Sequence, residues 1–150
     1  MSSYINFFVK SKSNDLCPIG DFSRNTVLYR TFEHIVPFGK VISIAKQTIL
    51  DVKEELKTQR EAEEVVLKEN EELLNKISTF NNPIEEKISA IYDQQDVIND
   101  IKDSIYEIEY AYNYVTALLE IVDTQPVENE NNYIYAGIEV QRDYSINNEN

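Results

Sequence analysis

Hydrophobic positions follow a helical period through the middle of the chain, from Val41 to Val122. In the first half, up to Ile77, they step alternately by four and three residues. Each step is close to one helical turn, so these side chains fall on a single stripe. The stripe is Ala45, Ile49, Val52, Leu56, Val66, Leu73 and Ile77, with the polar residues Gln59, Glu63 and Asn70 between them. The pattern predicts one long helix over 41–77.

The same kind of pattern predicts a second helix from Pro83 to Val122. Asn82 suits the N-cap, proline suits the first helical position, and Glu85 completes a capping box. The second stripe is Ile84, Ile88, Ile91, Gln95, Ile98, Ile101, Ile105, Ile108, Tyr112, Val115, Leu119 and Val122. Two helices of similar length joined by the five residues 78–82 are expected to pack as an antiparallel coiled-coil hairpin.

The predicted hairpin has a polar middle. Pairing the helices about their turn brings Glu63 near Gln95 and Asn70 near Ile91. One interpretation is a solvated, weakly packed segment that fixes the register of the two helices. The alternative is a hinge or a docking point for another subunit.

Hydrophobic residues outside the two stripes are too numerous for one pair of helices to cover. They are Ile42, Ile44, Val65, Leu67, Leu74, Ala90, Tyr92, Tyr106, Tyr110, Tyr114, Leu118 and Ile121. Burying each aliphatic side chain is worth roughly 1.5–3 kcal/mol. We therefore predict that the hairpin self-associates, as a dimer with four packed helices, and that a small head covers its open end.

Two strands are predicted near the ends of the chain. Segments 4–10 and 133–140 are rich in β-branched and aromatic residues. They are expected to pair with each other and to pack on the open end of the hairpin, because a two-stranded sheet is marginal alone. Segment 16–21 contains Pro18, which cannot donate a hydrogen bond within a sheet, so it is expected to be a loop or a short edge strand.

A short helix is predicted from Ser23 to Ile35, with Ser23 or Asn25 as its N-cap. The expected fold is mainly α, of the α+β class: a long antiparallel two-helix coiled-coil hairpin with a small head of two terminal β-strands and one short helix. We expect a single domain over 1–140, with the head at 1–40 and 126–140, the hairpin at 41–122, and a disordered tail at 141–150.

The net charge of the 150-residue chain is −13, and it is unevenly distributed. Residues 1–46 carry six basic and three acidic groups, a net +3, so the remainder carries −16. An acidic rod repels nucleic acid, and we expect no direct binding of nucleic acid.

No run of 18 apolar residues is present, so we expect no membrane span. The single cysteine, Cys17, and a start without a basic secretion signal favour the bacterial cytosol.

Catalytic, metal and cofactor motifs are not found in the sequence. His34 is the only histidine, and its place near the end of the short helix suits favourable interaction with the helix dipole. Three glycines, far apart, do not form a phosphate-binding loop. Acidic pairs such as Glu63–Glu64 are typical of helix surfaces. We therefore expect a non-enzymatic protein without a cofactor.

The strongest candidate site in the sequence is the start of the short helix. A helix start exposes unpaired backbone N–H groups, which suit a phosphate or a carboxylate. Arg24 adds a bidentate donor and Tyr29 a ring that stacks on a base. The predicted site for an anionic, nucleotide-like ligand is Ser23, Arg24, Asn25, Thr26, Tyr29, Arg30 and Lys40. The alternative is an ordinary capped helix whose arginines are solvated or pair with Asp21 and Glu33.

Three features of the chain together resemble small helical-hairpin proteins of bacteriophages and prophages. They are the run from Asp21 to Phe32 followed by Val36-Pro37-Phe38-Gly39-Lys40, the hairpin, and the closing Tyr-Ala-Gly-Ile-Glu-Val strand. The bias towards lysine, glutamate, isoleucine and asparagine is similar to that of low-GC bacteria and their phages. The resemblance implies an accessory protein that acts inside an infected cell, and it brings no established activity. We expect such a protein to sequester or antagonise a host defence factor.

Two other roles remain open for the acidic hairpin. Its carboxylates could imitate nucleic-acid phosphates and block a basic groove of a host protein. The mimic would consist of Glu54, Glu55, Glu61, Glu63, Glu64, Glu69, Glu71, Glu72, Asp93, Asp96, Asp100 and Asp103. Interleaved lysines such as Lys57 and Lys68 weaken this hypothesis. The hairpin could instead be purely structural, as a spacer or an oligomerisation element.

Overall fold

The computed structural model describes residues 2–11, 13–81, 83–124 and 134–141. Its elements are β1 (Ser2–Lys10), β2 (Leu16–Ser23), α1 (Val27–Phe32), β3 (Val41–Ile44), α2 (Lys46–Thr79), α3 (Ile84–Asp123) and β4 (Ile134–Gln141). The chain divides into two compact units. We call Met1–Glu54 with Ala111–Asn150 the head unit, and Glu55–Tyr110 the hairpin unit.

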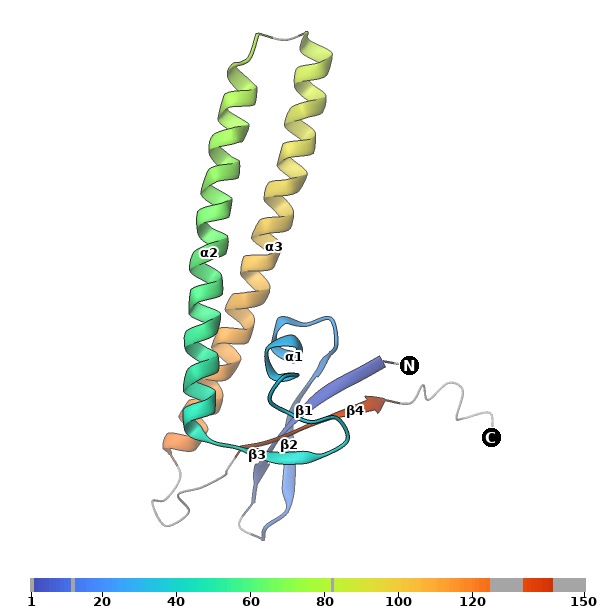
Figure 1. Cartoon of the computed structure of the whole chain (residues 1–150), viewed down its shortest axis with the longest axis vertical. Helices are drawn as coiled ribbons and strands as arrows, with labels where there is room; N and C mark the ends of the chain where they lie inside the picture. Colours follow the sequence, from blue (N-terminus) through green and yellow to red (C-terminus); the bar gives the residue numbers. More distant parts are fainter. Residues whose placement is uncertain (1, 12, 82, 125–133, 142–150) are drawn as a thin grey trace, which may run out of the picture. The chain divides into compact units, whose positions relative to one another are not determined.

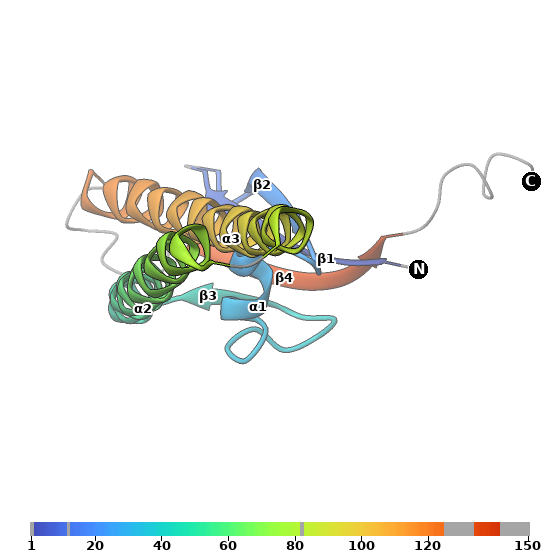
Figure 2. The same cartoon turned by 90° about the horizontal axis from the view of Figure 1, so that it is seen from above.

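The predicted fold class is confirmed. Helices α2 and α3, of 34 and 40 residues, form a long antiparallel pair, and a four-stranded antiparallel sheet with one short helix completes an α+β fold. The two long helices run side by side in both views of the chain (Figures 1 and 2). Both helices belong partly to the hairpin unit and partly to the head unit.

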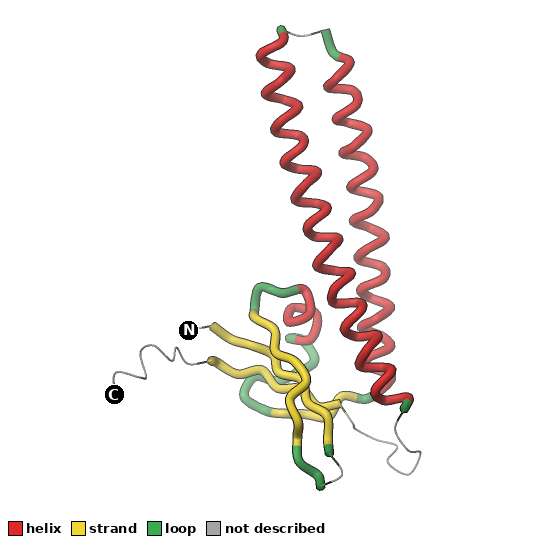
Figure 3. The backbone as a smooth tube through the Cα atoms, turned by 180° about the vertical axis from the view of Figure 1, so that it is seen from behind, coloured by secondary structure: helices red, strands yellow, loops and turns green. Residues whose placement is uncertain are grey.

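The sheet, whose strands are yellow in Figure 3, has the strand order β2-β1-β4-β3. The predicted pairing of the two terminal strands is confirmed, since β1 and β4 pair antiparallel from Ser2 opposite Gln141 to Val9 opposite Ile134. Segment 16–21 belongs to β2, an edge strand, and the edge position explains why Pro18 is tolerated there. A register shift between Phe7 and Phe8 marks a bulge in the pairing of β1 with β2.

The first long helix begins later than the sequence pattern predicts. Residues 41–44 form the edge strand β3, which pairs antiparallel with β4, and α2 begins only at Lys46. Val41, Ile42 and Ile44 are β-branched residues that fit a pleated, half-buried surface. Ile44 is buried opposite Ile134, so burial in the sheet takes precedence over continuation of the helix. The prediction of helix over 41–45 was wrong.

The short helix is also shorter than predicted. Helix α1 covers six residues, and its N-cap is Thr26, neither Ser23 nor Asn25. Ser23 is the last residue of β2, where it pairs with Tyr4, so it is unavailable as a cap. Residues 33–35 continue as turn after the helix.

Aromatic rings fill the core of the head unit. Phe7 of β1 contacts Phe32 of α1, with ring centroids 5.1 Å apart, and Tyr114 of α3, at 5.4 Å. Phe22 of β2 packs edge-on against Tyr114 at 4.7 Å. Because Phe7, Phe22, Phe32 and Tyr114 come from four different elements, this cluster holds the sheet, the short helix and the end of α3 together.

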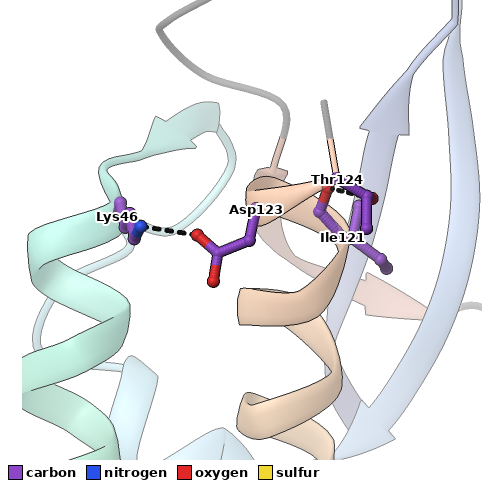
Figure 4. A network of polar contacts seen from close by, with 4 residues as sticks. All are labelled: Lys46, Ile121, Asp123 and Thr124. Carbon is purple, nitrogen blue, oxygen red and sulfur yellow. Dashed lines mark hydrogen bonds and ion pairs between the residues drawn. The ribbon is translucent and has the colours of Figure 1, made fainter. Parts of the chain in front are cut away.

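Aliphatic residues complete the head core. On β1 the buried residues Ile5 and Phe7 alternate with more exposed ones, as expected for a sheet with one covered face. The fully or nearly fully buried aliphatic side chains of the head unit include Ile5, Leu28, Val36, Ile49, Val52, Val115, Leu118, Ile134 and Ile138. At one end of the helices, Lys46 in the first turn of α2 forms an ion pair with Asp123 in the last turn of α3 (Figure 4). Both of these side chains are about half exposed, so the pair contributes little to stability.

The buried stripe in the hairpin unit agrees with the predicted one at Leu56, Ile98 and Ile108, and departs from it nearer the turn between the helices. Val66 and Leu73, which were expected on the stripe, are 39% and 43% exposed, whereas Leu67 and Leu74 are half-buried. A straight helix has 3.6 residues per turn and drifts against a strict repeat of 3.5, so the inward position moves along by one residue.

On α3 the same correction applies, because Gln94 is buried and Gln95 only half-buried, while Ile84 and Ile88 are 72% and 46% exposed. The predicted cap Asn82 lies outside the described residues. So does the predicted disordered tail, except for Gln141, which ends β4.

Candidate functional site

The residues of the predicted anion site lie mostly in one turn between β2 and α1. Ser23 ends β2, and Arg24 and Asn25 follow it with exposed side chains. The hydroxyl of Thr26 accepts a hydrogen bond from the backbone N–H of Tyr29 at 3.2 Å and donates one to the carbonyl of Ser23 at 2.8 Å. The cap therefore already satisfies part of the helix start, and a helix of only six residues offers a weak dipole.

Tyr29 is buried, with 5% of its surface exposed, and its hydroxyl lies 2.9 Å from that of Ser3. Its ring is therefore covered and is not available to stack on a ligand as the sequence hypothesis required. Arg30 is exposed in the last turn of α1, where its charge complements the negative end of the helix. These contacts match the alternative prediction, a capped helix with solvated arginines.

Lys40 lies apart from that turn, at a shallow hollow on the sheet. The hollow has a volume of about 170 Å³ and is lined by Asn6, Phe8, Gly39, Lys40, Val41, Gly137, Ile138 and Glu139. None of the other six predicted site residues lines it. The side-chain amide of Asn6 donates a hydrogen bond to Glu139 at 3.2 Å across this face. The geometry thus does not bring the seven predicted residues together into one site.

Sequence reasoning missed this hollow because it depends on strand register. Val41 pairs with Gly137, and Asn6 pairs with Gly137 from the other side. A Cβ on Gly137 would lie 2.8 Å from Cγ2 of Val41, so only glycine leaves room for that side chain. A glycine inside a predicted strand was the available signal for such a close approach.

The hairpin unit exposes most of its large hydrophobic residues. Among its described residues, the buried side chains are Leu56, Gln94, Ile98 and Ile108. Ten others are between 39% and 72% exposed: Val65, Val66, Leu73, Phe80, Ile84, Ile88, Tyr92, Val97, Tyr106 and Tyr110. One pair of helices does not cover these side chains. Val65, Tyr92, Tyr106 and Tyr110 were expected outside the two stripes, whereas Val66, Leu73, Ile84 and Ile88 were expected on them. Such a concentration of exposed apolar surface is typical of an interaction site.

A partly buried polar pair lies in the middle of the hairpin unit. The amide of Gln94 donates hydrogen bonds to the backbone carbonyl and to the side-chain oxygen of Asn70, both at 3.0 Å. Asn70 in turn donates to the carbonyl of Val66 at 2.8 Å. Asn70 is thus bonded to Gln94, which lies about one helical turn along α3 from Ile91, the residue expected near it. A polar pair satisfied in one alignment of the two helices supports the interpretation that the polar middle fixes register.

Exposed residues of α2, together with Phe80 directly after its end, form a second seam beside the buried stripe, which we call the leucine seam. Its members are Ala62, Val66, Glu69, Leu73, Lys76 and Phe80, spaced by four and three residues in alternation, and all six are exposed. The 4-3 spacing is the one with which a helix meets another helix. The apolar members Val66, Leu73 and Phe80 are 39%, 43% and 51% exposed.

No group of three or more histidine, cysteine, aspartate or glutamate side chains in the described part of the chain is arranged to hold a metal ion. Within the same residues, none of the helices combines the length and the apolar character that crossing a membrane requires. Comparison with models of protein families, with curated proteins and with solved structures finds no match to the chain.

Proposed function

We propose that this chain is a non-enzymatic binding protein that assembles into a dimer through its helical hairpin. The observation that carries the proposal is the leucine seam, a 4-3 row of exposed residues in which Val66, Leu73 and Phe80 are large and apolar. Burying Val66, Leu73 and Phe80 against a second copy removes their apolar surface from water, which favours association. A dimer of hairpins contains four packed helices, the arrangement expected from the sequence.

The leucine seam is complementary to itself in an antiparallel arrangement. Pairing two copies about Leu73 places Val66 towards the partner's Phe80. The same pairing places Glu69 towards the partner's Lys76, so that two pairs of opposite charge flank the centre. A closed dimer requires such a self-complementary patch, in which each copy offers both halves of every contact. Antiparallel pairing is thus favoured by the apolar and the charged members of the seam together.

Sedimentation equilibrium of the full chain tests the proposal. One chain has a mass of 17.5 kDa, so we expect a species of about 35 kDa. Leu73→Glu places two carboxylates against each other at the centre of the seam, and we expect it to yield a monomer with unchanged helix content by circular dichroism. Tyr106→Glu is the matched control, because it makes the same change in charge at an exposed residue of α3, and it should leave the dimer intact.

Two results count against the proposal. A wild-type chain that sediments as a monomer at tens of micromolar shows that the exposed residues do not drive association. A dimer that persists in Leu73→Glu shows that another surface makes the contact. A role in antagonising a host factor, expected from the resemblance to phage proteins, is compatible with this assembly and stays a prediction.

A further inference from the structure

Helix α3 carries a second exposed seam, which we call the tyrosine seam. It consists of Tyr92, Asp96, Asn99, Asp103, Tyr106 and Tyr110, again spaced by four and three residues, and all six are exposed. The rings of Tyr92, Tyr106 and Tyr110 are 68%, 70% and 54% exposed. From Tyr92 to Tyr110 the seam covers 18 helical steps, a length of about 27 Å. A flank of this length matches one helical segment of a partner.

The chemistry of the tyrosine seam differs from that of the leucine seam. Tyrosine supplies a large, rigid surface with a polar tip and is enriched at the energetic centres of protein interfaces. Between its rings the seam places the carboxylates of Asp96 and Asp103. From residue 92 to 110 the helix carries six acidic side chains and one lysine, a net charge of −5. This flank therefore attracts a cationic partner.

A second copy of the chain is a poor occupant for this seam. When two copies pair through the same flank, Asp96 and Asp103 of one approach the carboxylates of the other, and like charges at such distances repel. The leucine seam has no such conflict, because Glu69 and Lys76 are of opposite sign. The two seams thus select different partners by charge.

Two cation–π contacts in the head unit are of the kind that a basic partner would make with the tyrosine seam. The ammonium of Lys53 lies 5.2 Å from the ring centroid of Tyr112, and that of Lys10 lies 5.8 Å from the ring centroid of Tyr135. A cation over an aromatic face at such distances is attracted by the ring. Arginine makes this contact more often than lysine and also pairs with a carboxylate through two hydrogen bonds.

We propose that the tyrosine seam binds a basic helical segment of a partner protein. Arginine or lysine side chains of that segment pair with Asp96 and Asp103 and cross the rings of Tyr92 and Tyr106, while its apolar residues cover the ring edges. This binding goes beyond self-association and uses residues outside the leucine seam. It gives the assembled protein a surface for a second, different protein.

A labelled helical peptide of about 21 residues, or three heptads, tests the proposal, with leucine and arginine at the two seam positions of each heptad. Its binding to the full chain is followed by fluorescence anisotropy. The double variant Tyr92→Ala/Tyr106→Ala leaves the net charge unchanged. We expect it to bind the peptide at least about tenfold more weakly than the wild type. Both side chains are exposed, so the variant should keep its helix content. A peptide of the same composition with its arginines scattered around the helix should bind at least about tenfold more weakly.

Equal binding of the peptide to the tyrosine variant and to the wild type would overturn the proposal, because attraction would then depend on charge alone. Equal binding of the scattered peptide would overturn it for the same reason. Leu73→Glu separates this proposal from self-association. If Leu73→Glu is monomeric and binds the peptide like the wild type, both proposals are supported. If the wild type is itself monomeric but its peptide binding still depends on the tyrosines, only the proposal of a dimer is rejected.

Discussion

A single glycine sets how closely Tyr114 approaches the sheet. A Cβ at Gly20 would lie 2.5 Å from the hydroxyl oxygen and 3.2 Å from Cζ of Tyr114. The tyrosine ring cannot easily move away, because Phe7 and Phe22 both pack against it. Its hydroxyl also donates a hydrogen bond of 3.4 Å to the carbonyl of Ile19. The absence of a side chain at Gly20 therefore allows the aromatic core of the head unit to close.

Gly20→Ala should destabilise the chain, by about 1–3 kcal/mol, as expected for an overpacked core. The added methyl group must displace Tyr114 or the strand β2 that carries Gly20. The free energy of unfolding, measured by urea denaturation, checks this expectation.

Tyr114→Phe provides the control for that substitution. Alone, it removes a long hydrogen bond and should cost no more than about 1 kcal/mol. Combined with Gly20→Ala, it removes the oxygen that the methyl group meets, so the double variant should be more stable than the sum of the two single changes implies. Strict additivity would mean that the two residues do not interact.

The candidate anion site shows which part of a site can be predicted from residue types. The short helix itself was predicted, but its start was placed too early, since Arg24 and Asn25 form a turn before the cap at Thr26. The burial of Tyr29 was not predictable from its neighbours in the sequence, since its covering comes from Ser3 of a distant strand. Whether a ring is exposed depends on residues that are distant in the sequence and close only in the folded chain, so it could not be predicted from the residues around Tyr29.

At the scale of the element, one buried amide aligns the two long helices. Gln94 is 8% exposed and donates both of its described hydrogen bonds to Asn70. Gln94→Ala removes these bonds and leaves acceptor oxygens of Asn70 in a partly buried place. We expect a loss of about 1–3 kcal/mol in the free energy of unfolding.

Gln95→Ala is the matched control, because Gln95 is the adjacent residue of the same type. It is half-buried, and its amide donates to Asn99, an exposed neighbour on the same helix, at 3.3 Å. This substitution should change stability by about 0.5 kcal/mol or less. Similar losses of stability in the two variants would mean that Gln94 and Gln95 contribute equally to helix packing. That result would contradict the structure, in which Gln94 is the residue that faces α2.

Long elements were predictable, and short ones depended on their neighbours. The periodicity located α2 and α3 to within a few residues at three of their four ends, because many independent positions repeat the same signal. It extended α2 too far towards the N-terminus, since four residues such as Val41-Ile42-Ser43-Ile44 fit a strand or a helix equally well. Their pairing with β4 decides the matter, and that strand lies about 90 residues away along the chain.

At the scale of the whole molecule, the hairpin unit combines apolar association with strong negative charge. Residues 55–110 contain fifteen acidic and six basic side chains, a net charge of −9. Assembly through the leucine seam brings two such units together, so it proceeds against electrostatic repulsion. Binding of a basic segment at the tyrosine seam is instead favoured by the same charge. The two kinds of contact therefore respond to salt in opposite directions.

Raising the salt concentration from about 50 mM to about 500 mM should strengthen dimerisation by several-fold, because the screening length falls from about 14 Å to about 4 Å. The repulsion between two units of −9 is then largely removed. The two exposed Glu69–Lys76 pairs expected across the dimer weaken as well, but such pairs are worth only about 0.2–1 kcal/mol each. Sedimentation equilibrium at the two concentrations measures the change. Peptide binding at the tyrosine seam should weaken over the same range of salt. A dimer that instead dissociates as salt is added would show that ionic contacts hold it together and that the apolar members of the leucine seam do not.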